Sequence, residues 1–149
     1  MKSSFLIIAC FAACLFAACK PQKTGSTGNA GNAEITDTYW RLTELGGKAV
    51  APAAADKKEI YIRLKKEGNQ LQGFAGCNGF GGRFELKEGG RVVFSNMMGT
   101  MMACGDLATE NKLFDALREA DNYIHLGKKL ILNKAKMAPL ARFEADYSK

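Results

Sequence analysis

Two cysteines, one histidine and a group of methionines are the residues of this chain best suited to chemistry. Cys77 lies in the glycine-rich stretch GFAGCNGFGGRF at residues 73–84, Cys104 follows the stretch SNMMGTMMA, and His125 is the only histidine of the chain. Thiolates and imidazoles bind zinc, but a closed zinc site takes four ligands, which commonly come in close pairs such as Cys-x-x-Cys. Neither cysteine belongs to such a pair, so we expect no metal site.

Four methionines offer a softer kind of ligand. Met97, Met98, Met101 and Met102 stand as two adjacent pairs, and thioether sulfur suits Cu(I). An extended strand directs neighbouring side chains to opposite faces, which would separate the two members of each pair. Methionine is more commonly used to fill hydrophobic cores. A copper or redox-sensing role is therefore a minor alternative.

The remaining polar residues give no catalytic pattern. The glycine-rich stretch lacks the Gly-Lys-Ser/Thr ending of a phosphate-binding loop, so its glycines indicate a bend or bulge between strands. We expect Asn78 to hydrogen-bond the backbone of this bend. His125, in NYIHLG, is typical of a half-exposed strand residue, and Ser95 and Ser148 lie in no nucleophile motif. We expect no catalytic residues, no cofactor and no enzymatic activity.

The N-terminal residues indicate export and lipid attachment. Met1 and Lys2 precede an apolar run at residues 5–16, which is too short to span a bilayer and is typical of a signal peptide. The segment LFAAC, which ends at Cys19, resembles the lipobox of bacterial lipoproteins, where signal peptidase II cleaves before a cysteine that is then acylated. We predict a signal peptide at residues 1–18 and lipidation of Cys19. Cleavage before Cys14, or an ordinary secretory peptide, remains open.

The segment that follows reads as a tether to the membrane. Residues 20–33, KPQKTGSTGNAGNA, contain no branched aliphatic or aromatic side chain, and this composition is typical of a flexible linker. With Cys19 they make a lipidated tether at residues 19–33, and residues 34–149 suffice for one small domain. Lys20 follows the cysteine, and by the sorting rule of enteric bacteria we expect the outer membrane, with the domain facing the periplasm.

The charge distribution argues against nucleic acid as a partner. The formal net charge is +6, but removing Lys2, Lys20 and Lys23 from the 21 Lys and Arg residues leaves 18, against 15 Asp and Glu. The two signs are interspersed, and no basic stripe with interleaved aromatic residues is present. We therefore expect the membrane, reached through the lipid anchor, and an unknown envelope protein or ligand as partners.

The cysteine count favours one disulfide. Cys10 and Cys14 would leave with the signal peptide and Cys19 would carry lipid, so that Cys77 and Cys104 remain. An oxidising envelope compartment favours a bond between two remaining cysteines. Such a bond would close a loop of about 27 residues and stabilise the fold by about 3.5 kcal/mol. Free buried thiols are the alternative.

Strands predominate among the elements expected to position these residues. In EIYIRLK, Ile60, Ile62 and Leu64 alternate with polar residues, which is typical of a half-buried antiparallel strand. Turn signals stand at residues 46–47, 67–69, 88–90, 127 and 138–139. Further strands are expected at residues 39–45, 70–76, 82–86, 91–95, 129–133 and 140–145.

One segment has helical periodicity instead. In DLATENKLFDALREADNY, Leu113, Phe114, Leu117 and Ala120 form an apolar stripe, and Asp106 is a candidate N-cap. We predict an α+β fold, in which a curled antiparallel sheet (half-barrel) of about seven to eight strands carries one helix, inserted after about the fifth strand. The residues expected to be buried together are Trp40, Ile60, Ile62, Leu64, Phe84, Phe114 and Leu117.

Two short motifs, GCN at residues 76–78 and TMMAC at residues 100–104, give the chain a family resemblance. Together with YWRLTELGGK, IYIRL, ENKLFDAL and LGKKLIL in this order, they make the chain look like a META domain of the HslJ type. The resemblance implies an antiparallel sheet with one helix, no established enzymatic activity, and a place among secreted and lipid-anchored bacterial proteins of envelope stress and drug tolerance. The motif residues are Gly76, Cys77, Asn78, Thr100, Met101, Met102, Ala103 and Cys104.

Three classes of function follow. The first is a non-catalytic envelope lipoprotein that acts in stress or drug tolerance by contacting another envelope component. The second is a small-molecule or lipid-binding module that uses the concave face of the sheet, where Trp40 or Phe84 would line a cavity. A copper or redox protein ranks last.

Overall fold

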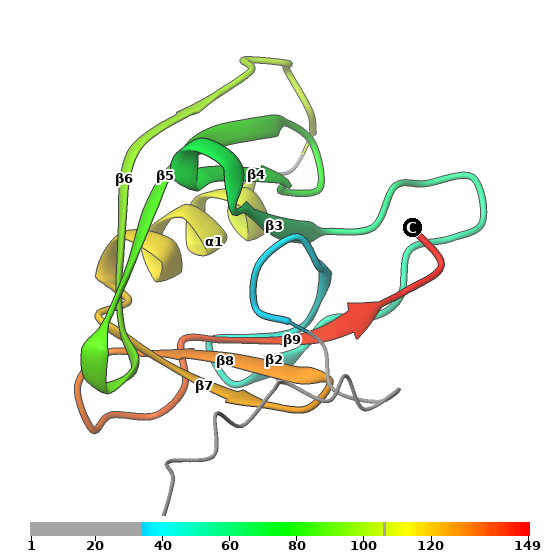
Figure 1. Ribbon diagram of the computed structural model, residues 1–149. Coiled ribbons are helices and arrows are strands. Elements are labelled where there is room, and N and C mark those ends of the chain that lie inside the picture. Colours follow the sequence, from blue (N-terminus) through cyan, green and yellow to red (C-terminus); the bar gives the residue numbers. More distant parts are fainter. Residues whose placement is uncertain (1–33, 106) are drawn as a thin grey trace, which may run out of the picture.

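The computed structural model describes residues 34–105 and 107–149 (Figure 1). The expected signal peptide, Cys19, the tether and the candidate N-cap Asp106 lie outside the described residues. Most of the described chain forms strands. In chain order the elements are β1 (Tyr39–Leu45), β2 (Lys48–Ala49), β3 (Tyr61–Lys65), β4 (Gln70–Phe74), β5 (Gly79–Lys87), β6 (Arg91–Gly99), α1 (Ala108–Glu119), β7 (Asn122–Leu126), β8 (Lys129–Asn133) and β9 (Ala141–Asp146).

The strands form one antiparallel sheet that closes on itself. Each strand from β3 to β9 pairs with its neighbour in the chain, β3 pairs with β1, and β1 pairs with β9. Strands β1 and β3 to β9 therefore make an eight-stranded barrel, and β2 is a two-residue addition to β1. The predicted α+β fold with a curled antiparallel sheet is confirmed, and the curl continues to closure because the first and last strands of the domain meet.

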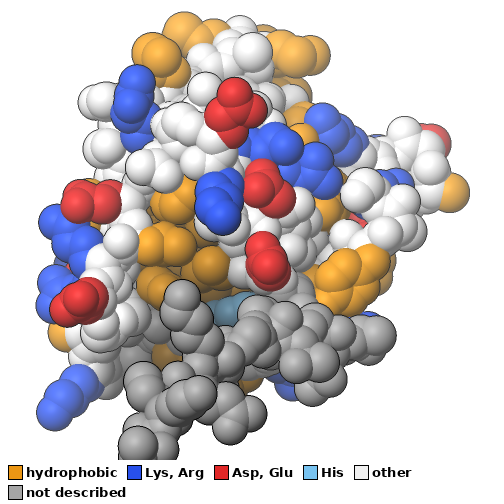
Figure 2. Space-filling model, viewed as in Figure 1, with side chains coloured by type: hydrophobic (Ala, Val, Ile, Leu, Met, Phe, Trp, Pro, Cys, Tyr) orange, Lys and Arg blue, Asp and Glu red, His pale blue; other side chains and the backbone are white. Residues whose placement is uncertain are grey.

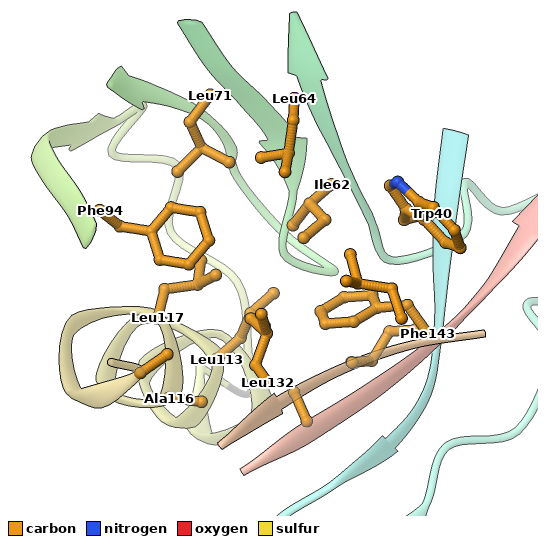
Figure 3. Close-up of a cluster of buried hydrophobic side chains, with 14 of the residues drawn as sticks. Trp40, Ile62, Leu64, Leu71, Phe94, Leu113, Ala116, Leu117, Leu132 and Phe143 are labelled. Carbon is orange, nitrogen blue, oxygen red and sulfur yellow. The ribbon is translucent and has the colours of Figure 1, made fainter. Parts of the chain in front are cut away.

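Helix α1 fills the barrel from one side. It follows β6, the fifth strand of the barrel, as expected, and Figure 1 shows it between the β4–β6 side and the β7–β9 side. Leu113 and Leu117 of α1 are fully buried and point into the core, where Leu117 lies beside Phe94 of the sheet (Figure 3). Burial of these side chains is what fixes the helix against the sheet.

Two residues of the expected core lie at its edge. Ile60 and Phe114 are only partly buried, although both pack against the core. Phe114 follows Leu113 directly, so the two side chains point about 100° apart around the helix axis. Its ring packs at 5.0 Å from that of Phe80, and the Arg118 guanidinium lies over it.

The concave face of the sheet is packed rather than hollow. Trp40 is fully buried and Phe84 is 5% exposed, and both belong to the hydrophobic core. The expectation that these two residues line a ligand cavity on the concave face is therefore wrong, because the apolar stripe of α1 and the side chains of the opposite strands occupy that space.

The glycine-rich stretch is partly a bend and partly a strand. The bend spans residues 75–78, closed by a hydrogen bond from the Ala75 N–H to the Asn78 carbonyl (2.9 Å), and the later glycines lie within β5. Gly73 pairs with Phe80 across the strands, and a Cβ at Gly73 would collide with the Phe80 ring and approach the Tyr61 carbonyl to 2.7 Å. Gly76 has a φ of 106°, which favours glycine.

The barrel has one weak seam, between β6 and β7. These two strands share a single residue pair, Arg91 with Asn122, whereas β6 pairs with β5 along most of its length. From Val93 to Gly99, no described strand pairs with the second edge of β6. Within residues 34–105 and 107–149, no helix is long and apolar enough to span a membrane.

Candidate functional site

The motif residues meet where the glycine-rich bend contacts the loop between β6 and α1. Cys77 and Cys104 form a disulfide with a Cα–Cα distance of 6.2 Å, which confirms the expected pairing. The bond joins the bend to the segment just before the helix. Its two cysteines are 27 residues apart in sequence, so the bond constrains a long loop of the unfolded chain.

Asn78 forms the centre of this contact. It is 2% exposed, and its Oδ1 accepts hydrogen bonds from the Met102 N–H (2.8 Å) and the Thr100 hydroxyl (2.7 Å). The expectation that Asn78 bonds the backbone of its own bend is wrong, because its side chain turns inward and reaches the loop that follows β6. Asn78 therefore fixes the position of that loop as a second tie beside the disulfide.

Glu110 is the partner that sequence reasoning missed. Its Oε1 accepts from the Asn78 Nδ2 (3.0 Å) and its Oε2 from the Asn78 backbone N–H (2.9 Å), and the residue is 9% exposed. A carboxylate this buried needs such donors to offset its desolvation. Glu110 precedes Leu113 by three residues and Leu117 by seven, so helical periodicity places it on the buried stripe, and this signal could have identified it.

We call the group Cys77, Asn78, Thr100, Met102, Cys104 and Glu110 the motif junction. It brings together most of the sequence-predicted motif residues, and in it the Asn78 amide bonds both the Glu110 carboxylate and the backbone of the loop. Gly76 lies at the start of the bend, while Met101 and Ala103 are exposed. The disulfide and the hydrogen bonds of the junction therefore hold the bend, the loop and the helix together.

The other candidate groups lie elsewhere. His125 of β7 is partly buried, its Nε2 lies 3.0 Å from the Gly127 carbonyl oxygen, and its ring packs edge-on against Trp40 with a centroid distance of 5.6 Å. Across the described part of the chain, no group of three or more His, Cys, Asp or Glu residues is arranged to hold a metal ion.

Tyr39, Asp121 and Asp146 have pKa values shifted from their ordinary values. Burial, together with the nearby charge of Glu59, raises the pKa of the Tyr39 phenol to about 12. The backbone N–H of Ala135 lowers the pKa of the Asp121 carboxyl, and hydrogen bonds from Ser148 lower that of Asp146.

Exposed apolar side chains gather beside the motif junction. Met98 is 75% exposed, Met101 98% and Met102 62%, whereas Val93, which is 43% exposed, lies near the other end of β6. Figure 2 shows hydrophobic side chains at the top of the molecule, over the loop that follows β6. The strand separates Met97, which packs on the core, from Met98 as expected, but Met101 and Met102 follow the end of β6 and are both exposed.

An open hollow adjoins these side chains. A bulge between β5 and β6 shifts the register between Gly81 and Arg83, and Asn96 opposite has a φ of 50°. The hollow has a volume of about 650 Å³ and is lined by Gly81, Gly82, Arg83, Asn96, Met97 and Met98. We call Met98, Met101, Met102 and this hollow the methionine surface.

Comparison with known proteins gives a family match over nearly the whole domain. The sequence pattern of the META domain family matches residues 33–147. An NMR structure of a protein from Burkholderia xenovorans is similar over 76% of this chain and 84% of its own, with 26% identity and a TM-score of 0.58.

A second NMR structure is similar in fold. It covers 72% of this chain and 87% of its own, with 22% identity and a TM-score of 0.55. No curated protein matches the chain. Because the family pattern extends over nearly all of the described residues, the chain belongs to the META domain family.

Proposed function

We propose that this chain is a non-catalytic, lipid-anchored envelope protein that binds an extended segment of another envelope protein at the methionine surface. The observation that carries the proposal is the unpaired edge of β6. From Val93 to Gly99 this edge has no described strand partner, and exposed apolar side chains flank it.

An unpaired strand edge offers main-chain hydrogen bonds to a second chain. Alternate residues of an antiparallel strand direct their N–H and C=O groups to the same side, so β6 can pair with an added strand. Exposed hydrophobic residues beside the edge would receive side chains of that strand. Methionine suits this role because its unbranched, polarizable side chain adapts to irregular partners.

The motif junction supports this role by holding the loop in place. Thr100 and Met102 are hydrogen-bonded to Asn78, and Cys104 is bonded to Cys77. Between these ties, Met101 is 98% exposed. A fastened loop loses less conformational entropy on binding than a free one, so the junction would prepare the loop for its partner.

The anchor and the location complete the proposal. We propose that Cys19 carries the lipid and holds the domain at the outer membrane, facing the periplasm, with no nucleic acid partner. The charge balance of residues 34–149 and the LFAAC segment support this. A role in envelope stress or drug tolerance follows from the family resemblance of the GCN and TMMAC motifs.

Site-specific photocrosslinking tests the proposed contact. The photoreactive residue p-benzoylphenylalanine is placed at Met101, or at the exposed Lys136 as a control, in the full lipid-anchored chain in bacterial cells. We expect a discrete adduct with one envelope protein from position 101 only. Absence of the adduct, or the same adduct from position 136, would contradict the proposal.

A pair of substitutions tests whether β6 takes part. Val93 and Ile124 are similarly exposed, at 43% and 45%, and lie on β6 and β7 respectively. Val93→Lys should reduce the position-101 adduct, because it puts a charge on β6 beside the unpaired edge to which the added strand would bind, whereas Ile124→Lys should leave the adduct intact. Equal yields from the two variants would exclude β6 as the contact.

A further inference from the structure

A second pocket lies beside the irregular segment between β2 and β3 and is bounded on one side by the glycine-rich bend. Its volume is about 320 Å³, and Leu42, Val50, Ile60 and Phe74 give it apolar walls. This volume is at the lower end of the range that holds small organic ligands. We call it the loop pocket.

The charged residues of the loop pocket are unbalanced. Arg41, Lys57 and Lys58 line it together with a single acid, Glu59. Arg41 is neutralised locally, because it contacts Glu59 at 3.7 Å and Glu144 at 3.1 Å. Among the described carboxylates, none forms an ion pair with Lys57 or Lys58, so two ammonium groups remain in excess.

The Lys58 ammonium is held beside the apolar wall. Its Nζ lies 5.0 Å from the centroid of the Phe74 ring and 5.2 Å from that of Tyr61. Both distances are within the range of a cation–π contact. The positive charge is therefore placed at the boundary between the apolar walls and the solvent.

A motif glycine shapes the same pocket. Gly76 lines the loop pocket, and a Cβ at this position would lie 3.3 Å from the Ile60 Cδ1. A larger side chain would therefore project toward Ile60. Glycine at position 76 therefore serves two purposes. It permits the φ of 106°, and its lack of a side chain leaves room between the bend and Ile60.

We propose that the loop pocket binds a small organic anion with an apolar body. The apolar body would lie against Leu42, Val50, Ile60 and Phe74, and the anionic group would pair with Lys57 and Lys58. Burial of apolar surface would supply most of the affinity, and the two lysines would select for negative charge. This site is separate from the methionine surface and does not depend on the proposed partner.

Two fluorescent probes that differ by one sulfonate group test the inference. The anion 1-anilinonaphthalene-8-sulfonate and the neutral N-phenyl-1-naphthylamine share one apolar body. They are titrated into the full mature chain, residues 19–149, carrying Cys19→Ser so that no lipid is attached. We expect the anion to bind at least about fivefold more tightly than the neutral probe, because two exposed charge pairs contribute about that factor.

Substitutions test whether the preference for the anionic probe arises at the loop pocket. The double substitution Lys57→Gln and Lys58→Gln should remove the preference for the anion, whereas Lys136→Gln, at an exposed lysine elsewhere, should keep it. Ala53→Phe, at a partly buried lining position, should weaken binding of both probes. Circular dichroism and the unfolding midpoint confirm that each variant is folded.

NMR locates the binding site directly. Addition of the anionic probe should shift the backbone amides of residues 50–60 and 74–76. Equal affinity for the two probes, an unchanged preference in the double variant, or amide shifts confined to other residues would each overturn the inference.

Discussion

At the scale of single residues, Asn78 connects three segments through one side chain. Its amide donates to Glu110, and its carbonyl oxygen accepts from Thr100 and Met102. Removing this side chain leaves one oxygen of the buried Glu110 carboxylate and the partly buried Met102 N–H without their partner. Such groups cost more when they are left unpaired than their hydrogen bonds contribute when formed.

We therefore predict that Asn78→Ala lowers the free energy of unfolding by about 3 kcal/mol. Urea denaturation of the domain measures this change. Asn111→Ala serves as the control, because Asn111 is exposed on α1. A loss below about 0.5 kcal/mol at Asn78, the usual size of a surface effect, would show that the junction contributes little to stability.

Tyr39 gives the chain a predicted pH dependence. Its folded pKa is raised to about 12, chiefly by burial, whereas an unfolded tyrosine titrates near pH 10. Between these values the unfolded state releases a proton that the folded state keeps. Stability contributed by Tyr39 is thus complete below about pH 10 and is lost as the pH rises toward 12.

Denaturant unfolding at pH 9 to 12 tests this dependence. Tyr39→Phe should flatten the decline in stability with pH, whereas Tyr147→Phe, at a residue that is 56% exposed, should not. The same slope in all three proteins would mean that the Tyr39 phenol is not buried as described.

At the scale of elements, local pattern predicted strands and helix well. Alternation in EIYIRLK correctly placed Ile62 and Leu64 inside, and helical spacing placed Leu113 and Leu117 in the core. These features follow from periods of two and 3.6 residues, which are local properties of the sequence.

Contacts between segments far apart in the chain are harder to predict from the sequence. Barrel closure depends on β1 meeting β9, and no local pattern specifies that pairing. The bond between Asn78 and Glu110 depends on a bend and a helix that are 32 residues apart. Ile60 was assigned to the core because it alternates correctly, but it precedes β3 and lies at the rim, where alternation no longer reports burial.

The disulfide joins two of these elements and should stabilise the fold accordingly. Replacing both Cys77 and Cys104 by Ser should lower the free energy of unfolding by about 3.5 kcal/mol in the chain-entropy account. Reduction of the unsubstituted chain with dithiothreitol should give a similar loss in urea denaturation. Identical unfolding curves with and without the reductant would contradict a stabilising role.

At the scale of the whole molecule, the lipid anchor determines where the domain can act. We predict that Cys19→Ala abolishes labelling with an alkyne fatty acid and releases the protein from the membrane fraction, because the acyl chains supply the attachment. Cys14→Ala is the matched control and should keep the label. Labelling that is lost in Cys14→Ala and retained in Cys19→Ala would instead favour cleavage before Cys14.

The central claim is that the unpaired edge of β6 is covered by a partner in the envelope. Hydrogen exchange of the backbone amides measures this most directly, with the lipid-anchored chain compared in isolated envelope membranes and after purification in detergent. The account predicts slower exchange for alternate residues between Val93 and Gly99 in the envelope, with little change in β8, whose two edges are already paired. Equal exchange of the β6 amides in the two preparations would contradict it.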